Sequence, residues 1–414
     1  MSPAPTCLDE TDPNSLTVEQ ALGRVLAACR PVVGREVLSI TEALDRVVAE
    51  PVTARIDVPP ARNAAMDGYA LRTADGRAGT RLRVVGVSAA GHPWAGSLAA
   101  GECIRILTGA VVPDSADSVV MQEQVDVAGD HVVLQRDATR GSHVRGRGED
   151  TRAGDVILET GRQLTAADIG LLASQGIGEV VALRRPRVTF FTTGDELVPV
   201  GQPLGPGQIH DSNRYMLAAL LRRYPVDFLD LGVIPDTEAA VREALTRAGE
   251  TADLIITTGG VSVGDADYVS RLLQQEGEVG FWKVAMKPGR PLAFGRFGKA
   301  QFLGLPGNPV SAMATFSLFV RPALQGLSGT EATPPWTLRA RLQGDLRKNP
   351  GRVDFQRGIL ERRDDGWIVR SAGGQGSHQL RSMSMANAYI VLPAESRGAA
   401  SGDEVDVIPF QSVF

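Results

Sequence analysis

The chain has 414 residues, of which 43% are hydrophobic, and it carries a formal net charge of −5. This length predicts several domains with sizeable cores, and the mildly acidic balance argues against a nucleic-acid-binding protein, which usually has a basic bias. Cys7, Cys29 and Cys103 are too scattered for a disulfide framework or a thiolate zinc site, and the chain has neither a bilayer-spanning apolar run nor a signal-peptide core, so we expect a cytoplasmic protein without a membrane segment.

Two helices are predicted near the N-terminus. Residues 15–30 have the apolar spacing of an amphipathic helix, which Ser15 or Thr17 caps. A second helix is predicted to begin after Thr41 and to end before Pro51, because proline cannot continue it.

The chain then becomes mainly β. Short β-branched runs alternate with glycine and proline turns between residues 52 and 144, which is typical of a β module. The predicted strands of this module are residues 81–87, 103–107, 118–122 and 131–135. A helix is predicted at residues 166–175.

From Pro186 the pattern alternates between strands and helices. Strands are predicted at residues 188–191, 226–231, 254–257, 292–294 and 301–303. Helices are predicted at residues 214–223, 237–248, 268–276 and 309–324. This alternation predicts a mostly parallel sheet with helices on both faces, whose ligands bind at the carboxyl ends of the strands. Residues 334–414 return to a β pattern typical of a small barrel or sandwich.

The loop after the predicted strand 254–257 is rich in glycine and acid. Gly259 and Gly260 let the backbone approach a ligand closely and expose N–H groups that bind an anion. Asp265 and Asp267 follow where carboxylates could hold a hard cation against that anion. The pattern favours a phosphorylated ligand bound with a metal.

Two further loops follow predicted strands and should lie at the same edge of the sheet. The three loops are residues 192–197, 257–267 and 304–311. Asp195 and Glu196 would then approach the aspartates of the glycine-rich loop, and the helix that starts at Pro309 would offer N–H groups to an anion. Each loop alone is more typical of an ordinary tight turn, but three such loops with acidic residues at matching ends favour a site. Neither a P-loop motif nor a dinucleotide-binding glycine motif is present.

Lys283 and Lys287 are candidates for binding an oxyanion. If residues 281–291 are extended, the even spacing of these lysines puts both on one face. The alternative is a solvated edge strand whose lysines prevent unwanted pairing. In the first half, Asp67-Gly68 taken alone is more typical of a tight hairpin turn than of a site.

The motifs together resemble those of the molybdenum-insertion enzymes of molybdenum cofactor synthesis, the molybdopterin molybdenumtransferases, which include the E domain of gephyrin. The motifs that carry the resemblance are Met66-Asp67-Gly68-Tyr69-Ala70, Thr108-Gly109-Ala110, Arg147-Gly148-Glu149-Asp150, Thr193-Gly194-Asp195-Glu196-Leu197, Asp211-Ser212-Asn213, Gly259-Gly260-Val261-Ser262-Val263-Gly264-Asp265, Lys287-Pro288-Gly289, Leu305-Pro306-Gly307-Asn308-Pro309, Pro350-Gly351-Arg352, Phe355-Gln356-Arg357-Gly358 and Gln375-Gly376-Ser377-His378. They occur in the family's order and cover nearly the whole chain.

The resemblance implies a fold of the α/β and β multidomain class. It implies a discontinuous N-terminal domain (residues 1–54 and 146–185), an inserted β module (residues 55–145), a doubly wound α/β domain that binds molybdopterin (residues 186–330) and a C-terminal β-barrel-like domain (residues 331–414). It also implies a homodimer whose active cleft lies between the α/β domain of one subunit and the first half of the other.

The implied reaction inserts molybdate into adenylylated molybdopterin with Mg²⁺ as cofactor and releases AMP. The implied partners are these two substrates, a second copy of the chain, a molybdopterin adenylyltransferase and downstream cofactor-handling proteins. No nucleic acid and no membrane are expected. A scaffolding role, or a transferase or hydrolase reaction on another phosphorylated pterin or nucleotide, is the alternative.

Carried over residue by residue, the resemblance implies three sets of site residues. The catalytic residues are Asp67, Asp150, Glu196, Lys283 and Lys287. The substrate-binding residues are Thr108, Arg145, Thr193, Gly194, Ser212, Gly259, Gly260, Ser262, Pro306, Gly307, Asn308, Arg357 and Ser377. The metal ligands are Glu196, Asp236, Asp265 and Asp267.

Overall fold

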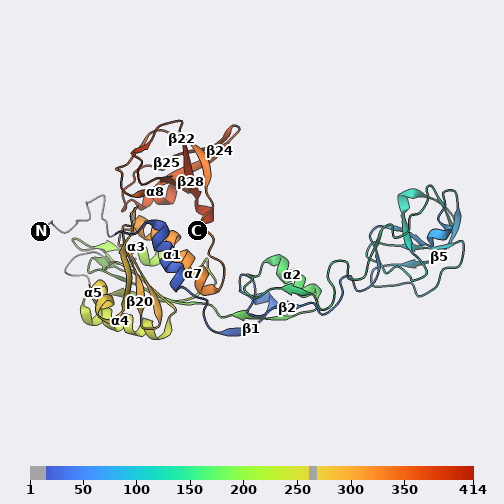
Figure 1. Ribbon diagram of the computed structural model, residues 1–414, viewed down its shortest axis with the longest axis horizontal. Coiled ribbons are helices and arrows are strands. Elements are labelled where there is room, and N and C mark those ends of the chain that lie inside the picture. Colours follow the sequence, from blue (N-terminus) through green and yellow to red (C-terminus); the bar gives the residue numbers. More distant parts are fainter. Residues whose placement is uncertain (1–14, 261–267) are drawn as a thin grey trace. The chain divides into compact units, whose positions relative to one another are not determined.

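The computed structural model describes residues 15–260 and 268–414 (Figure 1). The chain folds into two compact units, one of Met1–Glu36 with Leu183–Phe414 and the other of Val37–Ala182. The predicted α/β and β multidomain class is confirmed, whereas the residue boundaries of the four predicted parts stay a prediction. None of the described helices is long and apolar enough to cross a membrane.

The first unit contains a six-stranded sheet. Its strands in spatial order are β16 (Asp227–Ile234), β13 (Arg187–Thr193), β17 (Leu254–Thr258), β21 (Ala300–Leu305), β20 (Pro291–Phe297) and β18 (Glu278–Lys283). The pairs among β16, β13, β17 and β21 are parallel, whereas β20 is antiparallel to both of its neighbours. The prediction of a mostly parallel sheet is therefore confirmed.

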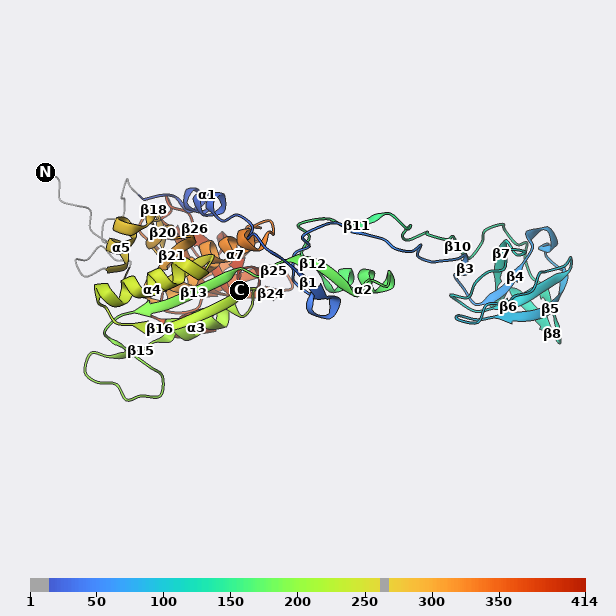
Figure 2. The ribbon, with the colours of Figure 1, turned by 90° about the horizontal axis from the view of Figure 1, so that it is seen from below.

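Helices cover both faces of this sheet (Figures 1 and 2). On the face toward the C-terminal barrel lie α1 (Val18–Ala28), α3 (Ser212–Leu221), α6 (Pro309–Thr315) and α7 (Arg321–Ser328), and on the other face lie α4 (Glu238–Thr251) and α5 (Tyr268–Glu276). Leu254 and Ile256 of β17 pack into the first of these cores, and Ile255 between them packs into the second. This alternation explains the continuous apolar run of the strand.

Local sequence signals explain where several helices begin. Thr17 caps α1, because its hydroxyl accepts from the Gln20 N–H at 3.2 Å while the Gln20 side chain accepts from the Thr17 N–H at 3.0 Å. The helix predicted at residues 309–324 is confirmed but is not regular, since a π-helical segment, Phe316–Val320, joins α6 to α7.

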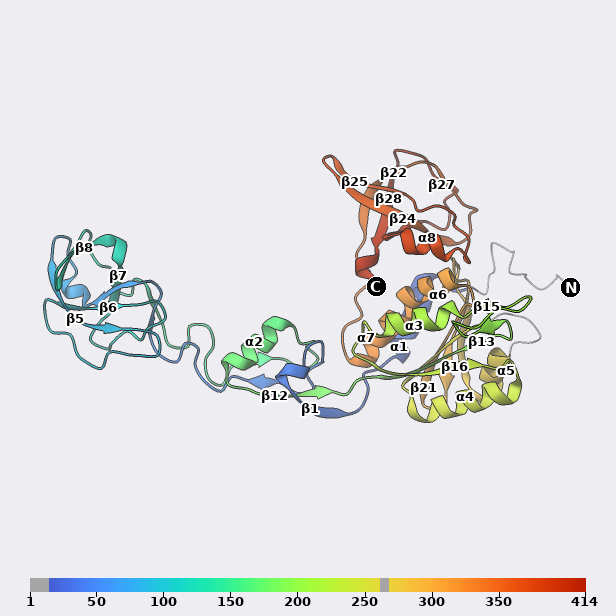
Figure 3. The ribbon, with the colours of Figure 1, turned by 180° about the vertical axis from the view of Figure 1, so that it is seen from behind.

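The C-terminal part is a closed barrel. Its strands in order are β24 (Val353–Arg363), β25 (Gly366–Ser371), β22 (Leu338–Gln343), β28 (Glu404–Pro409) and β26 (Ala388–Leu392), and β26 pairs back with β24. A short strand from the α/β region, β19 (Met286–Lys287), adds to β24, and the pair β23 (Leu346–Arg347) and β27 (Gly398–Ala399) lies outside the ring. Figure 3 shows the barrel helix α8 (Leu380–Met385) beside α6.

The second unit is mainly β. Its six-stranded sheet has the order β7 (Ser118–Met121), β4 (Gly68–Leu71), β6 (Glu102–Ile106), β5 (Arg81–Ser88), β9 (His131–Leu134) and β8 (Val125–Ala128). Three two-stranded ladders pair β1 (Arg35–Ser39) with β12 (Glu179–Leu183), β2 (Val52–Thr53) with β11 (Val156–Leu158), and β3 (Asn63–Ala64) with β10 (Val144–Arg145). The predicted helix at residues 166–175 is confirmed as α2 (Ala166–Ser174).

The predicted helix after Thr41 is wrong. This segment has only one 3-10 turn, Ile40–Glu42, and Asp45 adopts a left-handed φ of 63°. Val47 and Val48 then form isolated β-bridges to Gln163 and Ala182, which are distant in sequence. Tertiary pairing of β-branched residues therefore overrides the helical periodicity.

Candidate active site

The parallel strands of the α/β sheet end level with one another. Thr193 of β13 is in register with Ile234 of β16, and Thr258 of β17 is in register with both Thr192 and Leu305. The loops that follow these strands therefore emerge side by side at one edge. The prediction that the three loops begin at one edge of the sheet is confirmed, and residues 235–237 join them there as a further loop.

Glycine allows two of these loops to touch. Gly259 has a φ of 85°, and a Cβ atom there would lie 2.5 Å from the Thr193 carbonyl oxygen. Gly260 has a φ of 65°, and its Cβ would lie 2.8 Å from a methyl group of Val269. A side chain at either position would displace these neighbours, so the packing at this edge depends on glycine. The predicted approach of this backbone to a ligand stays a prediction.

Two buried polar side chains fix the start of α3 against the sheet edge. The Asp211 carboxylate accepts from the Thr192 hydroxyl at 2.6 Å and from the Arg214 N–H at 3.0 Å. The Asn213 amide donates to the Gly307 carbonyl oxygen at 2.7 Å. Asn213 thereby holds the loop of Pro306, Gly307 and Asn308 in place, a role that its type and position alone do not predict. Ser212 is exposed at the first turn of this helix.

Three acidic residues approach one another at the same edge. The Asp236 N–H donates to the Asp195 carboxylate at 3.4 Å. Burial, followed by the negative charges of Asp195 and Glu196, raises the pKa of Asp236. Gly194 lies beside this group, because its Cβ would meet the Glu196 carboxylate at 2.7 Å. Carboxylates that repel one another in this way suit a bound cation.

These acids do not form a complete metal site on their own. Within residues 15–260 and 268–414, no three acidic, histidine or cysteine side chains are grouped as metal ligands. Ser262, Asp265 and Asp267, which were predicted to act here, lie outside the described residues. Glu196 and Asp236 therefore fit Mg²⁺ as part of a ligand set that oxygen atoms of a bound phosphorylated ligand would complete.

Lys283 and Lys287 do not share a face of one strand, and this prediction is wrong. Lys283 ends β18 in the α/β sheet, whereas Lys287 belongs to β19, which pairs with β24 of the barrel. The chain turns between them, where the Met286 N–H donates to the Val284 carbonyl oxygen at 2.8 Å. Lys287 is half exposed, and its ammonium lies 3.8 Å from the buried carboxylate of Asp354.

A loop of the barrel reaches the α/β domain. The Val310 N–H at the start of α6 donates to the Ser377 carbonyl oxygen at 3.1 Å. Arg357, which is 1% exposed, fixes this loop by donating to the carbonyl oxygens of Gly374 at 2.8 Å and Gly376 at 3.0 Å. The start of α6 was predicted to offer N–H groups to an anion. One of them, the Val310 N–H, donates to the barrel instead.

In the second unit, Asp67 and Thr108 are brought together. One carboxylate oxygen of Asp67 accepts from both the N–H and the hydroxyl of Thr108, each at 2.7 Å. These two hydrogen bonds and then the charge of Arg105 lower the pKa of Asp67. Asp67 is therefore an ionised acceptor at neutral pH. The neighbouring Gly68 is the first residue of β4, so it is not part of a tight turn. A Cβ atom at Gly68 would lie 2.0 Å from the Val120 carbonyl oxygen of β7.

Arg145 and Asp150 are exposed in the same unit. Arg145 is opposite Asn63 in the β3–β10 ladder, and its side chain has no hydrogen bond or ion pair with any described residue. Asp150 is held by its backbone, whose N–H donates to the Val58 carbonyl oxygen at 3.0 Å. Arg105 was missed, although it is a cation beside Asp67 that also lies over the Tyr69 ring at 5.1 Å.

Three family models match the chain in order. The "MoeA N-terminal region (domain I and II)" matches residues 16–176, the "probable molybdopterin binding domain" matches residues 189–326, and the "MoeA C-terminal region (domain IV)" matches residues 339–410. The second match covers the sheet edge described above.

Curated relatives and solved structures match over nearly the full length. A molybdopterin molybdenumtransferase of Haemophilus influenzae is 42% identical over 95% of this chain and 98% of its own length, and one of a Nostoc species is 37% identical over 90% and 88%. The crystal structure of the molybdopterin biosynthesis moeA protein from Pyrococcus horikoshii is 31% identical, with a TM-score of 0.82, over 95% of this chain and 100% of that chain.

A doubly wound domain with a glycine-lined sheet edge, joined to a closed barrel and a β-rich unit, defines a multidomain enzyme of the molybdopterin-binding class. Within that class, the chain belongs to the molybdopterin molybdenumtransferase family, and the family resemblance of its motifs is thereby confirmed.

Proposed function

We propose that the protein inserts molybdate into adenylylated molybdopterin with the help of Mg²⁺, releasing AMP and forming molybdenum cofactor. The observation that carries this proposal is the level ending of four parallel strands, which collects glycine-rich backbone and the carboxylates of Glu196 and Asp236 at one edge. The names of the curated relatives, molybdopterin molybdenumtransferase, support the same reaction.

The loops at this edge would bind the pyrophosphate of the substrate. Backbone N–H groups near Gly259 and Gly260 suit phosphate oxygens, because glycine lets the chain approach without a side chain in between. Asn213 orients the Gly307 carbonyl and so keeps the third loop in register with the others. Thr193 would contribute from the end of β13, where its carbonyl touches the glycine loop.

Glu196 and Asp236 would hold Mg²⁺, together with Asp265 and Asp267. When bound, Mg²⁺ neutralises charge that develops on phosphate oxygens as the phosphoanhydride bond breaks. Burial and then repulsion by Asp195 and Glu196 raise the pKa of Asp236, and such a cation would relieve the repulsion. Because the chemistry consists of metal insertion and loss of AMP, the protein need not supply a covalent nucleophile.

Lys283, Lys287, Arg357 and Ser377 would bind the molybdate dianion or the terminal phosphate. Lys287 is the accessible cation of this group, whereas Arg357 acts by shaping the loop that contains Ser377. A dianion needs several donors and positive charges to offset its loss of hydration. We also propose that the protein is cytoplasmic and that a molybdopterin adenylyltransferase supplies its substrate.

Reconstitution with defined substrates tests this function. The purified chain, adenylylated molybdopterin, molybdate and Mg²⁺ should together yield AMP and protein-bound molybdenum cofactor, measured by chromatography and mass spectrometry. Chelation of Mg²⁺ should stop AMP release, because the phosphate charge is then no longer neutralised. AMP release that proceeds equally without molybdate would instead indicate a simple hydrolase.

We further propose a homodimer in which Asp67, Thr108, Arg145 and Asp150 of one subunit complete the site of the other. These four residues lie in one compact unit of the chain, and the sheet-edge residues lie in the other. This separation motivates the proposal. If inactive Asp67→Ala and inactive Glu196→Ala proteins are mixed and allowed to exchange subunits, the mixed dimers should regain one intact site. Absence of any recovered AMP release, after subunit exchange is verified by native mass spectrometry, would contradict the shared site.

A further inference from the structure

Two segments of the chain connect the compact units, and one arginine holds both of them at their base. Residues 33–36 lead out of the first unit, and residues 183–187 lead back into it. The Arg184 N–H donates to the Gly34 carbonyl oxygen at 3.0 Å, which joins the two segments where the ladder of β1 and β12 begins. A few residues at such a junction can decide how freely two parts of a chain move.

The side chain of Arg184 makes four hydrogen bonds within the first unit. Its Nε donates to the Val33 carbonyl oxygen at 3.2 Å on the outgoing segment, and its Nη1 donates to the Arg185 carbonyl oxygen at 3.0 Å on the returning segment. Its two terminal nitrogens also donate to the two carboxylate oxygens of Asp253, each at 2.7 Å. This two-bond arrangement is the strong geometry of an arginine–carboxylate pair.

Asp253 belongs to the framework of the α/β sheet. It directly precedes β17, and its N–H donates to the Arg187 carbonyl oxygen at 2.8 Å, while the Arg187 N–H donates to its carboxylate at 2.7 Å. Its carbonyl oxygen accepts from the Gln301 N–H of β21 at 2.9 Å. Asp253 is therefore fixed to β13 and β21 at the amino ends of these parallel strands, at the opposite edge of the sheet from the candidate active site.

Gly34 leaves room for this arginine. Its φ is 144°, and a Cβ atom there would lie 2.9 Å from Cδ of the Arg184 side chain. The side chains of Arg184 and Asp253 are only 25% and 19% exposed, so water competes less with their hydrogen bonds than at a fully exposed pair. We call Arg184, Asp253 and the two segments that they hold the junction clamp.

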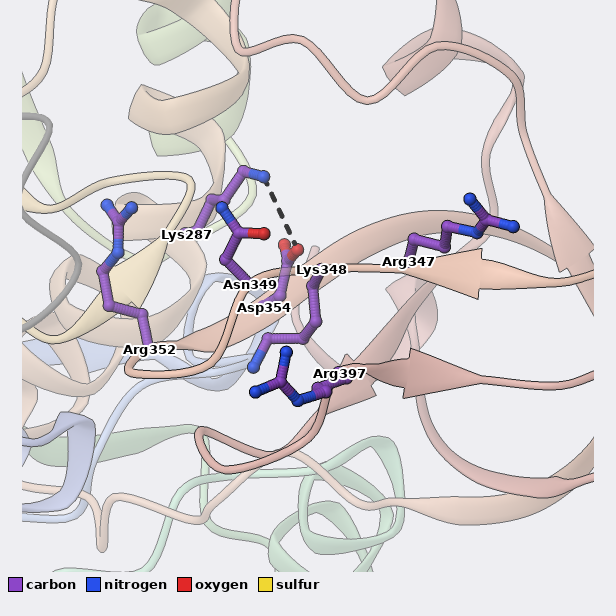
Figure 4. Close-up of a pocket in the computed structure, with 7 residues that line it drawn as sticks. All are labelled: Lys287, Arg347, Lys348, Asn349, Arg352, Asp354 and Arg397. Carbon is purple, nitrogen blue, oxygen red and sulfur yellow. Dashed lines mark ion pairs between the residues drawn. The ribbon is translucent and has the colours of Figure 1, made fainter.

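The junction clamp differs in its contacts from arginines that are open to a ligand. Arg352 and Arg397 line the pocket beside Lys287 of the candidate active site, where a ligand can approach them (Figure 4). The Arg184 guanidinium instead donates to protein oxygens on three separate segments. These contacts suit a residue that holds the backbone in place.

We propose that Arg184 and Asp253 are positioning residues for the reaction, because they hold the base of both connecting segments and thereby raise the fraction of molecules whose second unit can complete a site. This inference rests on the proposed homodimer, in which Asp67 and Thr108 of one subunit complete the site of the other. Apparent affinity falls in proportion to the fraction of molecules that are competent to bind. A loosened junction therefore weakens substrate binding and leaves the chemistry at the sheet edge unchanged.

Asp253→Asn tests the junction clamp in the full chain. The substitution keeps the size of the side chain but removes the two-bond fork with Arg184. Hydrogen exchange, measured by mass spectrometry, should become about tenfold faster for residues 184–187, whose Arg184 and Arg187 N–H groups are bonded at the clamp. The dissociation constant for adenylylated molybdopterin, measured without molybdate, should rise about tenfold. AMP release at saturating substrate and molybdate should stay at the wild-type rate.

Glu102→Gln is the matched control. The Glu102 carboxylate accepts from the Arg83 guanidinium at 2.6 Å and from the Ala99 N–H at 2.9 Å, and its side chain is 16% exposed. It lies on β6 of the second unit, so it has the contacts of Asp253 without its place at the junction. This variant should show a similar drop in melting temperature, with wild-type exchange at residues 184–187 and a wild-type dissociation constant.

Arg184→Lys is a second, milder variant, because lysine keeps the positive charge beside Asp253 but cannot form the fork. It should show the same direction of change in exchange and in affinity. Wild-type affinity in either clamp variant, or an equal loss of affinity in Glu102→Gln, overturns the proposal. If the wild type binds the substrate but releases no AMP, the proposed reaction fails, while the comparison of dissociation constants still decides the role of the clamp.

Discussion

Replacing Glu196 by glutamine is expected to reduce Mg²⁺-dependent AMP release by roughly a hundredfold or more, since even the residues that only orient metal ligands contribute about 10–100-fold. Glu196 is exposed at the sheet edge, and its charge raises the pKa of Asp236. The substitution keeps the shape of the side chain and removes its charge, so a metal bound between these acids loses affinity. The measurement is the rate of AMP release against Mg²⁺ concentration.

Glu243→Gln is the matched control for this experiment. Glu243 is an exposed glutamate on α4 with no hydrogen bond or ion pair to another described residue, so its replacement should leave the rate unchanged. Both variants should melt at nearly the wild-type temperature, because neither side chain is buried. Wild-type kinetics in a folded Glu196→Gln protein would remove Glu196 from the metal site.

Gly259→Ala is the second substitution with a large expected effect, on both activity and stability. Alanine at a φ of 85° is strained, which costs about 1–3 kcal/mol. Its methyl group would also stand 2.5 Å from the Thr193 carbonyl oxygen, so the loop after β13 must move. We expect a lower urea midpoint and loss of most AMP release, because the N–H groups that are proposed to bind the pyrophosphate are displaced.

Gly207→Ala distinguishes the effect of backbone strain from the effect of moving the loop after β13. Gly207 has a similar left-handed φ of 78°, but nothing lies within 4 Å of the position of its Cβ. Its replacement should cause the strain penalty alone and leave AMP release near the wild-type rate. Equal rates in the two variants would show that contact between the glycine loop and Thr193 is not needed for the reaction.

The sheet edge could be predicted from the sequence because its cause is local. Each loop follows an apolar run that reads as a buried strand, and the carboxyl ends of parallel strands meet at one edge. Gly259 and Gly260 stand out in the sequence for the same reason that they matter in the structure, which is the absence of a side chain where two backbones touch.

Interactions between distant segments could not be predicted in this way. The pairing of Lys287 with the barrel, and the hydrogen bond from Val310 to Ser377, join parts of the chain that have no shared periodicity. The same limit explains the failed helix after Thr41, where Val47 and Val48 pair with partners far along the chain.

The hydrogen bond between Val310 and Ser377 also bears on the order in which the protein matures during synthesis. The ribosome adds about 5–20 residues per second, so the α/β domain leaves the exit tunnel several seconds before the barrel loop does. During that interval the start of α6 has no partner for its Val310 N–H, and the sheet edge is incomplete. A nascent chain therefore completes this edge of the sheet only near the end of translation.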